Sequence, residues 1–237
     1  MDPISATDRL FFEETGLEPA AARKSLMDGL AGADDGELFL ERTTSESLGF
    51  DDGVLRAASN DVSQGFGLRA VAGEFAAYAH GGEISNAALA RAAETAREAG
   101  KGRGGALADG PPIQNKRIYD SADPTQTPDF AAKVSVLEQI DAYLRAKDPL
   151  VAQVSGSIHA EMQAVRIIRA DGREAADFRR LVRVSISVTV KRGDRMETGS
   201  DGRGGRMPLA QFLEEDGWRT SADEALRQAL VKLESVP

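Results

Sequence analysis

Residues that could carry acid–base or metal chemistry are sparse in this chain of 237 residues. It holds two histidines, His80 and His159, and no cysteine. His159-Ala160-Glu161 has the H-x-E spacing that opens the zinc deaminase signature, but that signature also needs a Pro-Cys-x-x-Cys segment. On a strand His159 and Glu161 would share one face, so we interpret them as a surface pair. Two histidines so far apart in sequence also form no HExxH-type metal helix.

Three glycine patterns suggest phosphate or nucleotide binding at first sight. Residues 65–70 (GFGLRA) match a loose dinucleotide pattern, yet the glycines lie within a strand-like segment, not between a strand and a helix. We interpret them as positions where another backbone, a peptide included, can approach closely. Residues 100–105 (GKGRGG) lack the phosphate-loop spacing and predict a surface loop. The same holds for residues 199–206, whose two arginines could still bind a carboxylate.

Charge and composition exclude several classes of protein. The chain carries 29 Lys and Arg against 38 Asp and Glu, a net charge of -9, which argues against general binding to nucleic acids. Without cysteine it has no disulfide, zinc finger, iron–sulfur cluster or cysteine nucleophile. The acidic N-terminal sequence does not resemble a signal peptide, and no apolar run approaches the ~20 residues of a membrane span. We therefore expect a soluble, cytoplasmic protein without a membrane partner.

Local patterns predict helices that alternate with runs of strands. An amphipathic pattern predicts helices over residues 17–31 and 86–99, after residue 128, and from Ser221 onward, with a weaker one over residues 6–14. Residues 35–82 predict a meander of four or five short strands, and residues 150–206 a second run of strands. Strands in runs joined by short turns are typical of an α+β fold with antiparallel sheet, and not of a parallel βαβ fold. We expect helices between and flanking the two runs.

A Gly- and Pro-rich connection over residues 101–128 interrupts these elements. Long connections of this kind are often functional or mobile. The connection suggests that the region 1–237 contains two possible sub-units, residues 1–100 and 129–237.

Several segments resemble the TldD/PmbA family, whose members include the TldD-like metalloproteases. They occur in the order found in the family and cover nearly the whole chain. The segments that carry the resemblance are residues 35–41 (DGELFLE), 63–74 (SQGFGLRAVAGE), 77–80 (AYAH), 169–173 (RADGR) and 221–230 (SADEALRQAL).

The resemblance implies a metal-dependent peptidase that acts on unfolded or extended peptides as a pair of TldD-like and PmbA-like subunits. Some members carry the older label of modulators of DNA gyrase. In the family, two histidines of an HExxxH helix and a later cysteine hold the metal, and the glutamate is the general base. This chain has no HExxxH and no cysteine, so no catalytic or metal-binding residue is assigned in it. We expect it to end before the catalytic half, to be inactive alone, and zinc or another divalent metal to bind in that missing half.

The remaining half is expected to form subunit contacts and part of the wall that admits an extended peptide. Such a peptide would add to an exposed strand edge through backbone hydrogen bonds. The candidate peptide-binding or interface residues are Gln64, Gly65, Phe66, Gly67, Arg69, Tyr78 and His80.

A non-catalytic alternative stays open. The chain could be a scaffold or peptide-binding module that only assembles with a PmbA-like or TldD-like partner subunit, as a hetero- or homodimer. Direct binding to DNA or to gyrase is disfavoured by the acidic balance.

Overall fold

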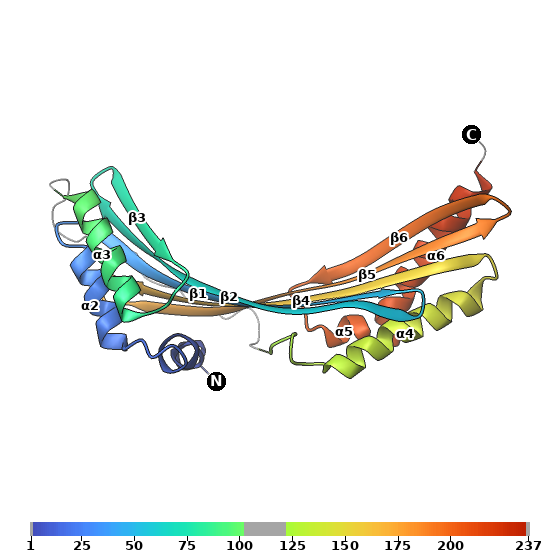
Figure 1. The fold of residues 1–237 in the computed structure, drawn as a ribbon, viewed down its shortest axis with the longest axis horizontal. Coiled ribbons are helices and arrows are strands. Elements are labelled where there is room, and N and C mark those ends of the chain that lie inside the picture. Colours follow the sequence, from blue (N-terminus) through green and yellow to red (C-terminus); the bar gives the residue numbers. More distant parts are fainter. Residues whose placement is uncertain (1, 102–121, 236–237) are drawn as a thin grey trace. The chain divides into compact units, whose positions relative to one another are not determined.

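The computed structural model describes residues 2–101 and 122–235 and confirms the α+β fold (Figure 1). In these residues six strands form one sheet in the order β3-β2-β1-β4-β5-β6, so the two predicted runs, β1 to β3 and β4 to β6, meet at β1 and β4. The strands are β1 (Asp35–Asp51), β2 (Val54–Ala72), β3 (Phe75–Gly81), β4 (Val151–Arg169), β5 (Glu174–Arg192) and β6 (Arg195–Gly205).

Helices lie before, between and after the two runs of strands. Ser85 caps α3, because its side chain accepts a hydrogen bond from the Ala88 N–H at 3.2 Å, and Asp129 caps α4 through the Ala132 N–H at 2.8 Å. The helices are α1 (Pro3–Asp8), the π-helix η1 (Arg9–Glu13), α2 (Pro19–Gly29), α3 (Asn86–Gly100), α4 (Phe130–Lys147), α5 (Ala210–Leu213) and α6 (Glu215–Glu234).

The sheet is antiparallel. β2 pairs with β3 and β5 with β6 in antiparallel register. At one end of the β1–β4 pair the Ala170 N–H donates to the Gly36 carbonyl at 3.0 Å, and at the other the Asp52 N–H donates to the Val154 carbonyl at 2.9 Å. The start of β1 therefore lies beside the end of β4.

The first run holds three strands, so the prediction of four or five short ones was wrong. β1 and β2 are 17 and 19 residues long. Along β2, residues 56–64 are exposed on both faces and therefore lack the alternation that marks a strand in sequence. In contrast, β5 buries every second residue from Val182 to Val190, and its predicted alternation is confirmed.

The chain divides into two compact units. The first comprises Met1–Thr43, Val62–Ser121 and Gln163–Arg179. Its helices α2 and α3 pack on each other, and α3 packs beside β3 (Figure 1). Its buried core includes three phenylalanines and several leucines, among them Phe11, Phe12, Phe66, Leu26, Leu38, Leu68 and Leu89.

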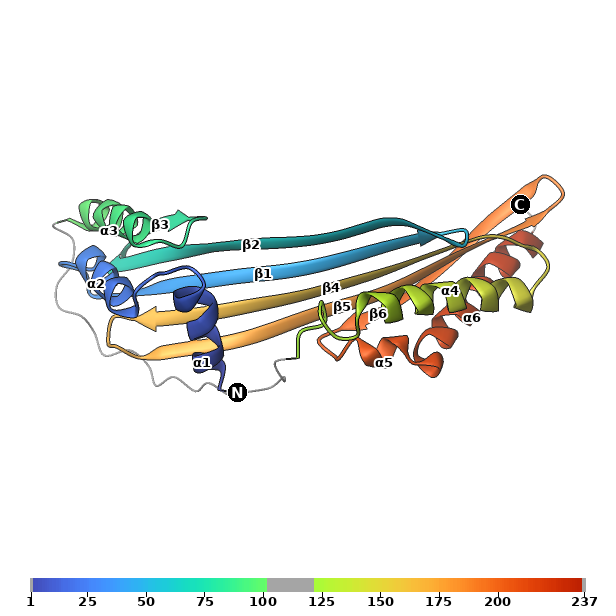
Figure 2. The same ribbon diagram turned by 60° about the horizontal axis from the view of Figure 1, so that its bottom comes forward.

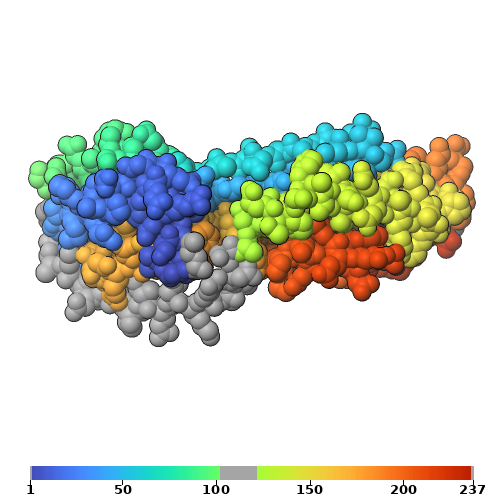
Figure 3. Space-filling model, turned by 90° about the horizontal axis from the view of Figure 1, so that it is seen from below, coloured from blue at the N-terminus to red at the C-terminus, as the bar shows by residue number. Residues whose placement is uncertain are grey.

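The second unit comprises Thr44–Asp61, Ala122–Met162 and Arg180–Pro237. Its helices α4 and α6 lie side by side (Figures 2 and 3) and bury a core on the sheet. Trp218, the single tryptophan of the chain, lies in this core with 3% of its surface exposed. Its fluorescence therefore reports on the folding of the second unit.

The last helix begins earlier than the sequence predicts. We expected Ser221 to cap it, but α6 starts at Glu215 and Ser221 is buried within it. Burial of Trp218 against Tyr143 of α4, with ring centroids 5.4 Å apart, explains the extra turns. Whether residues 1–100 and 129–237 form separate sub-units stays a prediction, and most of the connection 101–128, with most of the 100–105 glycine pattern, lies outside the described residues.

Gly199 of β6 lets α6 approach the sheet backbone. A Cβ at this position would lie 2.6 Å from the Ala229 nitrogen and closer still to the Ala225 carbonyl oxygen. We therefore expect Gly199→Val to lower the free energy of unfolding by about 3 kcal/mol, measured by urea unfolding with Trp218 fluorescence. Thr198→Val, on the opposite, exposed face, is the control, with an expected change within ~0.5 kcal/mol. Equal effects of the two variants would contradict this packing.

Candidate functional site

The β2–β3 hairpin brings most of the predicted site residues together. Gly67 pairs with His80, and Arg69 pairs with Tyr78. Because directly paired residues point to the same face of a sheet, these four positions share one face. Phe66 points to the other face and is buried in the core.

Gln64 and Gly65 lie just before the paired part of β2. Gln64 is exposed and Gly65 half-buried. A Cβ on Gly65 would lie 2.8 Å from the Gly81 carbonyl oxygen, so this glycine lets the chain's own backbone approach. A Cβ on Gly67 would meet no atom within 4 Å. The two glycines thus differ: the first serves the hairpin, and the second leaves an open face.

Arg69 and Tyr78 form a cross-strand pair on that open face. The Arg69 Nε donates to the Tyr78 hydroxyl at 3.0 Å, and the guanidinium carbon lies 5.9 Å from the ring centroid. The hydrogen bond to Tyr78 raises the pKa of Arg69 above its usual value, and Glu37 lies 3.6 Å from the Arg69 guanidinium. The pair therefore presents a permanently charged cation beside an exposed aromatic ring.

The edge of the sheet near these residues belongs to β3. β3 is the terminal strand of the sheet order, and along Phe66–Ala72 β2 lies between β3 and β1. A peptide that adds to the sheet edge would therefore pair with β3, and the segment 65–67 could meet it only across a face.

A groove of about 440 Å³ lies along β3 and α3. Its strand side comes from Tyr78–Gly82, and its helix side from residues spaced i, i+3, i+4 and i+7 along α3. The residues of the helix side are Ala88, Arg91, Ala92 and Thr95. The groove includes three of the predicted residues, Phe66, Tyr78 and His80, whereas Arg91 was not predicted because its position beside an edge strand depends on the tertiary fold.

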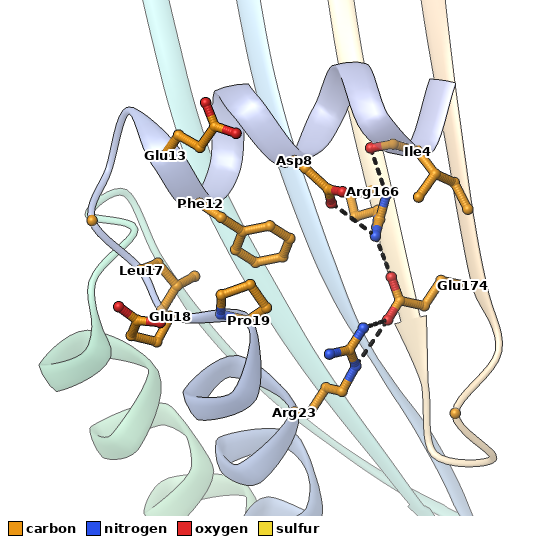
Figure 4. A pocket seen from close by; sticks show the side chains of 12 residues that line it. Ile4, Asp8, Phe12, Glu13, Leu17, Glu18, Pro19, Arg23, Arg166 and Glu174 are labelled. Atoms are coloured by element: carbon orange, nitrogen blue, oxygen red, sulfur yellow. Dashed lines mark hydrogen bonds and ion pairs between the residues drawn. The ribbon is translucent and has the colours of Figure 1, made fainter. Parts of the chain in front are cut away.

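A larger pocket, of about 810 Å³, lies between the N-terminal helices and the sheet (Figure 4). Phe12, from the π-helix, points into it, with Leu17 and Pro19 below. Asp8, Arg166, Glu174 and Arg23 follow one another along one wall. No motif predicted this pocket; the one signal is an arginine inside the apolar run around Arg166 of β4.

Arg166 joins the N-terminal segment to the sheet. It is 2% exposed and donates to the Ile4 carbonyl at 2.9 Å and to the Thr7 hydroxyl at 3.0 Å. It is also paired with Asp8 at 3.1 Å and with Glu174, and Glu174 accepts further hydrogen bonds from Nη2 of Arg23 and from its Nε, the latter at 2.9 Å. These contacts occupy Nη1 and Nη2 of Arg166 with the chain's own groups, whereas its buried Nε has no hydrogen-bond partner among the described residues. We interpret Arg166 as a structural residue.

Two domain models of one protein family match consecutive parts of the chain. The description "PmbA/TldA metallopeptidase domain 1" matches residues 36–100, and "PmbA/TldA metallopeptidase central domain" matches residues 123–233. The chain belongs to the PmbA/TldD metallopeptidase family. The resemblance seen in the sequence is confirmed.

Relatives and solved structures agree with this membership. The chain is 35% identical to a Haemophilus influenzae protein named "Metalloprotease TldD homolog" over 86% of its own length and 44% of the relative. It is 28% identical to a Buchnera aphidicola protein of the same name, over 85% of the chain and 43% of the relative. The chain thus spans less than half the length of these curated relatives.

Two crystal structures share its fold. A Thermotoga maritima protein labelled as a candidate DNA gyrase modulator aligns with a TM-score of 0.71 at 13% identity, over 92% of this chain and 50% of that one. TldE from Thermococcus kodakarensis aligns with a TM-score of 0.60 at 14% identity, over 89% and 47%. At these identities the likeness concerns the fold alone.

The described residues contain no set of side chains that could bind the metal of a PmbA/TldD metallopeptidase. No group of three or more His, Cys, Asp or Glu among residues 2–101 and 122–235 is placed to hold a metal ion. We therefore derive no metal-dependent step from them. His159 and Glu161 are half-buried and alternate along β4 with buried neighbours, as a pair on one face would. Within the same ranges, no helix is both long and apolar enough to cross a bilayer.

Proposed function

We propose that this chain forms the substrate-access and assembly part of a metal-dependent peptidase that acts on unfolded or extended peptides. Family membership supports a peptidase context, and metal binding and general-base catalysis are assigned to residues outside this chain. The observation that carries the proposal is the outer edge of β3, which pairs with no other strand of the described residues and lies in the first family domain beside a groove. An extended peptide would add there as a further strand, with backbone hydrogen bonds that tolerate many sequences.

Peptide chemistry tests this mode of binding directly. We expect the fluorescence anisotropy of a fluorescein-labelled unstructured peptide to rise when the chain is added. A peptide of scrambled sequence should bind with similar affinity. N-methylation of alternate peptide amides, on the side that faces β3, should weaken binding about tenfold or more, because each lost backbone hydrogen bond costs ~1 kcal/mol. Equal binding of the methylated and unmethylated peptides would contradict strand addition.

The variant Gly67→Val distinguishes a peptide that pairs with the edge of β3 from a peptide that lies across the sheet face at Gly67. Its side chain has free space, so folding should be unaffected. Binding at the β3 edge predicts unchanged affinity, since β2 is not the edge strand there. A weaker affinity would instead place the peptide over Gly67, Arg69, Tyr78 and His80.

The scaffold alternative is favoured by a second feature, the segment 54–61 of β2 in the second unit. Apart from Leu55 its residues are exposed, and β3 pairs with β2 only from Phe66 onward. Uncovered strand edges are sites where other chains can pair. A pull-down that shows stable capture of a TldD-like or PmbA-like subunit, lost on Ser59→Pro, together with no peptide binding, would favour the scaffold.

A further inference from the structure

The groove between β3 and α3 has the shape of a site for an extended segment. The strand side contributes Ala79, Gly81 and Gly82, and the helix side contributes Ala88 and Ala92. None of these residues has a side chain larger than a methyl group. The side chains of a peptide paired with β3 alternate in direction, so every second one would point toward this flank of α3.

Arg91 is distinctive among the arginines of the first unit. It is exposed on α3 and lines the groove, and in the described residues its guanidinium takes part in no ion pair. The other described arginines of that unit each have an acidic partner within 4.0 Å; these are Arg9, Arg23, Arg42, Arg69, Arg97, Arg166, Arg169, Arg173 and Arg179.

An unpaired guanidinium at the wall of a groove is a ready partner for a carboxylate, because its donors fit both carboxylate oxygens. The groove follows the strand lengthwise, so a peptide continues past Arg91 with its backbone on β3. A side-chain carboxylate that points toward α3 can therefore pair with Arg91 while the peptide strand continues along β3.

We infer that the β3–α3 groove binds an extended peptide with an acidic side chain placed against Arg91. This inference rests on the proposed strand addition and adds to it the class of residue that the site prefers. Among the described residues Glu83 is the one acidic side chain that lines the groove, and it disfavours a second carboxylate at its own position.

The experiment compares two labelled peptides with amidated C-termini, one with a central Glu flanked by small residues and one with Ala in its place. We expect the Glu peptide to bind about two- to fivefold more tightly, as an exposed ion pair does, and the difference to shrink in high salt. Arg91→Ala should abolish the preference, and Arg91→Glu should reverse it toward a peptide with a central Lys. A third peptide, with Ala and a free C-terminal carboxylate, tests the other source of the charge.

Arg97→Glu is the matched control, because it makes the same change of charge at another exposed position of α3 that does not line the groove. Its expected effect on the preference is small. An equal loss of preference in Arg97→Glu and Arg91→Glu, a preference for the free C-terminus alone, or equal binding of the Glu and Ala peptides would overturn the role of Arg91 and leave strand addition in place. Failure of every peptide to bind would overturn both.

Discussion

In the variant Lys133→Ala the second unit should unfold at much lower urea concentration than in the unsubstituted chain, because its free energy of unfolding falls by about 3–5 kcal/mol. Lys133 is 0% exposed on α4, where its Nζ is paired with Glu46 of β1 and donates to the Thr125 carbonyl at 3.0 Å. Removal of the ammonium leaves the Glu46 carboxylate buried without its partner, which costs more than the pair itself gains. Trp218 fluorescence reports the transition.

A double variant tests that reasoning. Lys133→Met combined with Glu46→Leu removes both charges and keeps apolar volume, so it should regain most of the lost stability. If the double variant were as unstable as Lys133→Ala, the loss would come from packing and not from an uncompensated carboxylate.

Arg166→Ala is the second substitution with a large expected effect. Because it breaks a buried ion-pair and hydrogen-bond network, the free energy of unfolding should fall by about 3–5 kcal/mol. It removes the buried side chain that binds Ile4, Thr7 and Asp8, and it leaves Glu174 with Arg23 as its ion-pair partner among the described residues. The loss should appear in hydrogen exchange as faster labelling of residues 3–13.

Arg9→Ala is the control in the same segment. Its side chain is 75% exposed and pairs only with Glu14 among the described residues, so a surface effect within ~0.5 kcal/mol is expected. Unchanged protection of residues 3–13 in Arg166→Ala would show that the apolar contacts of Phe11 and Phe12 hold the N-terminal segment without the arginine.

Local sequence predicted the elements whose two faces differ. β5 alternates strictly because one face packs on α4 and α6, and α3 was bounded by Ser85 because a cap acts within one turn. The outer part of β2 could not be predicted, since residues exposed on both faces carry no period. The start of α6 depends on the contact between Trp218 and Tyr143, which lies outside any local pattern.

Local sequence also predicted part of the candidate site, because a single hairpin brings several of its residues together. A tight turn after Ala72 places Gly67 opposite His80 and Arg69 opposite Tyr78, so one hairpin accounts for that set. Sequence could not show that β3 is the edge strand, because strand order is a property of the whole sheet. It also could not single out Arg91, whose distinction is the lack of an ion-pair partner among the described residues of its unit.

The two proposed functions of this chain involve different parts of the described fold, the outer edge of β3 and the segment 54–61 of β2. If the chain binds peptides, the peptide should contact the edge of β3. If it serves assembly alone, a partner subunit should contact residues 54–61. A measurement that locates the contact therefore decides between them.

Hydrogen exchange of the chain with and without an unstructured peptide is that measurement. The account predicts slower exchange of those backbone amides in β3 that point away from β2, because the peptide backbone accepts hydrogen bonds from them. It predicts no change over residues 54–61. Slower exchange over residues 54–61 alone, or no change anywhere at saturating peptide, would contradict it.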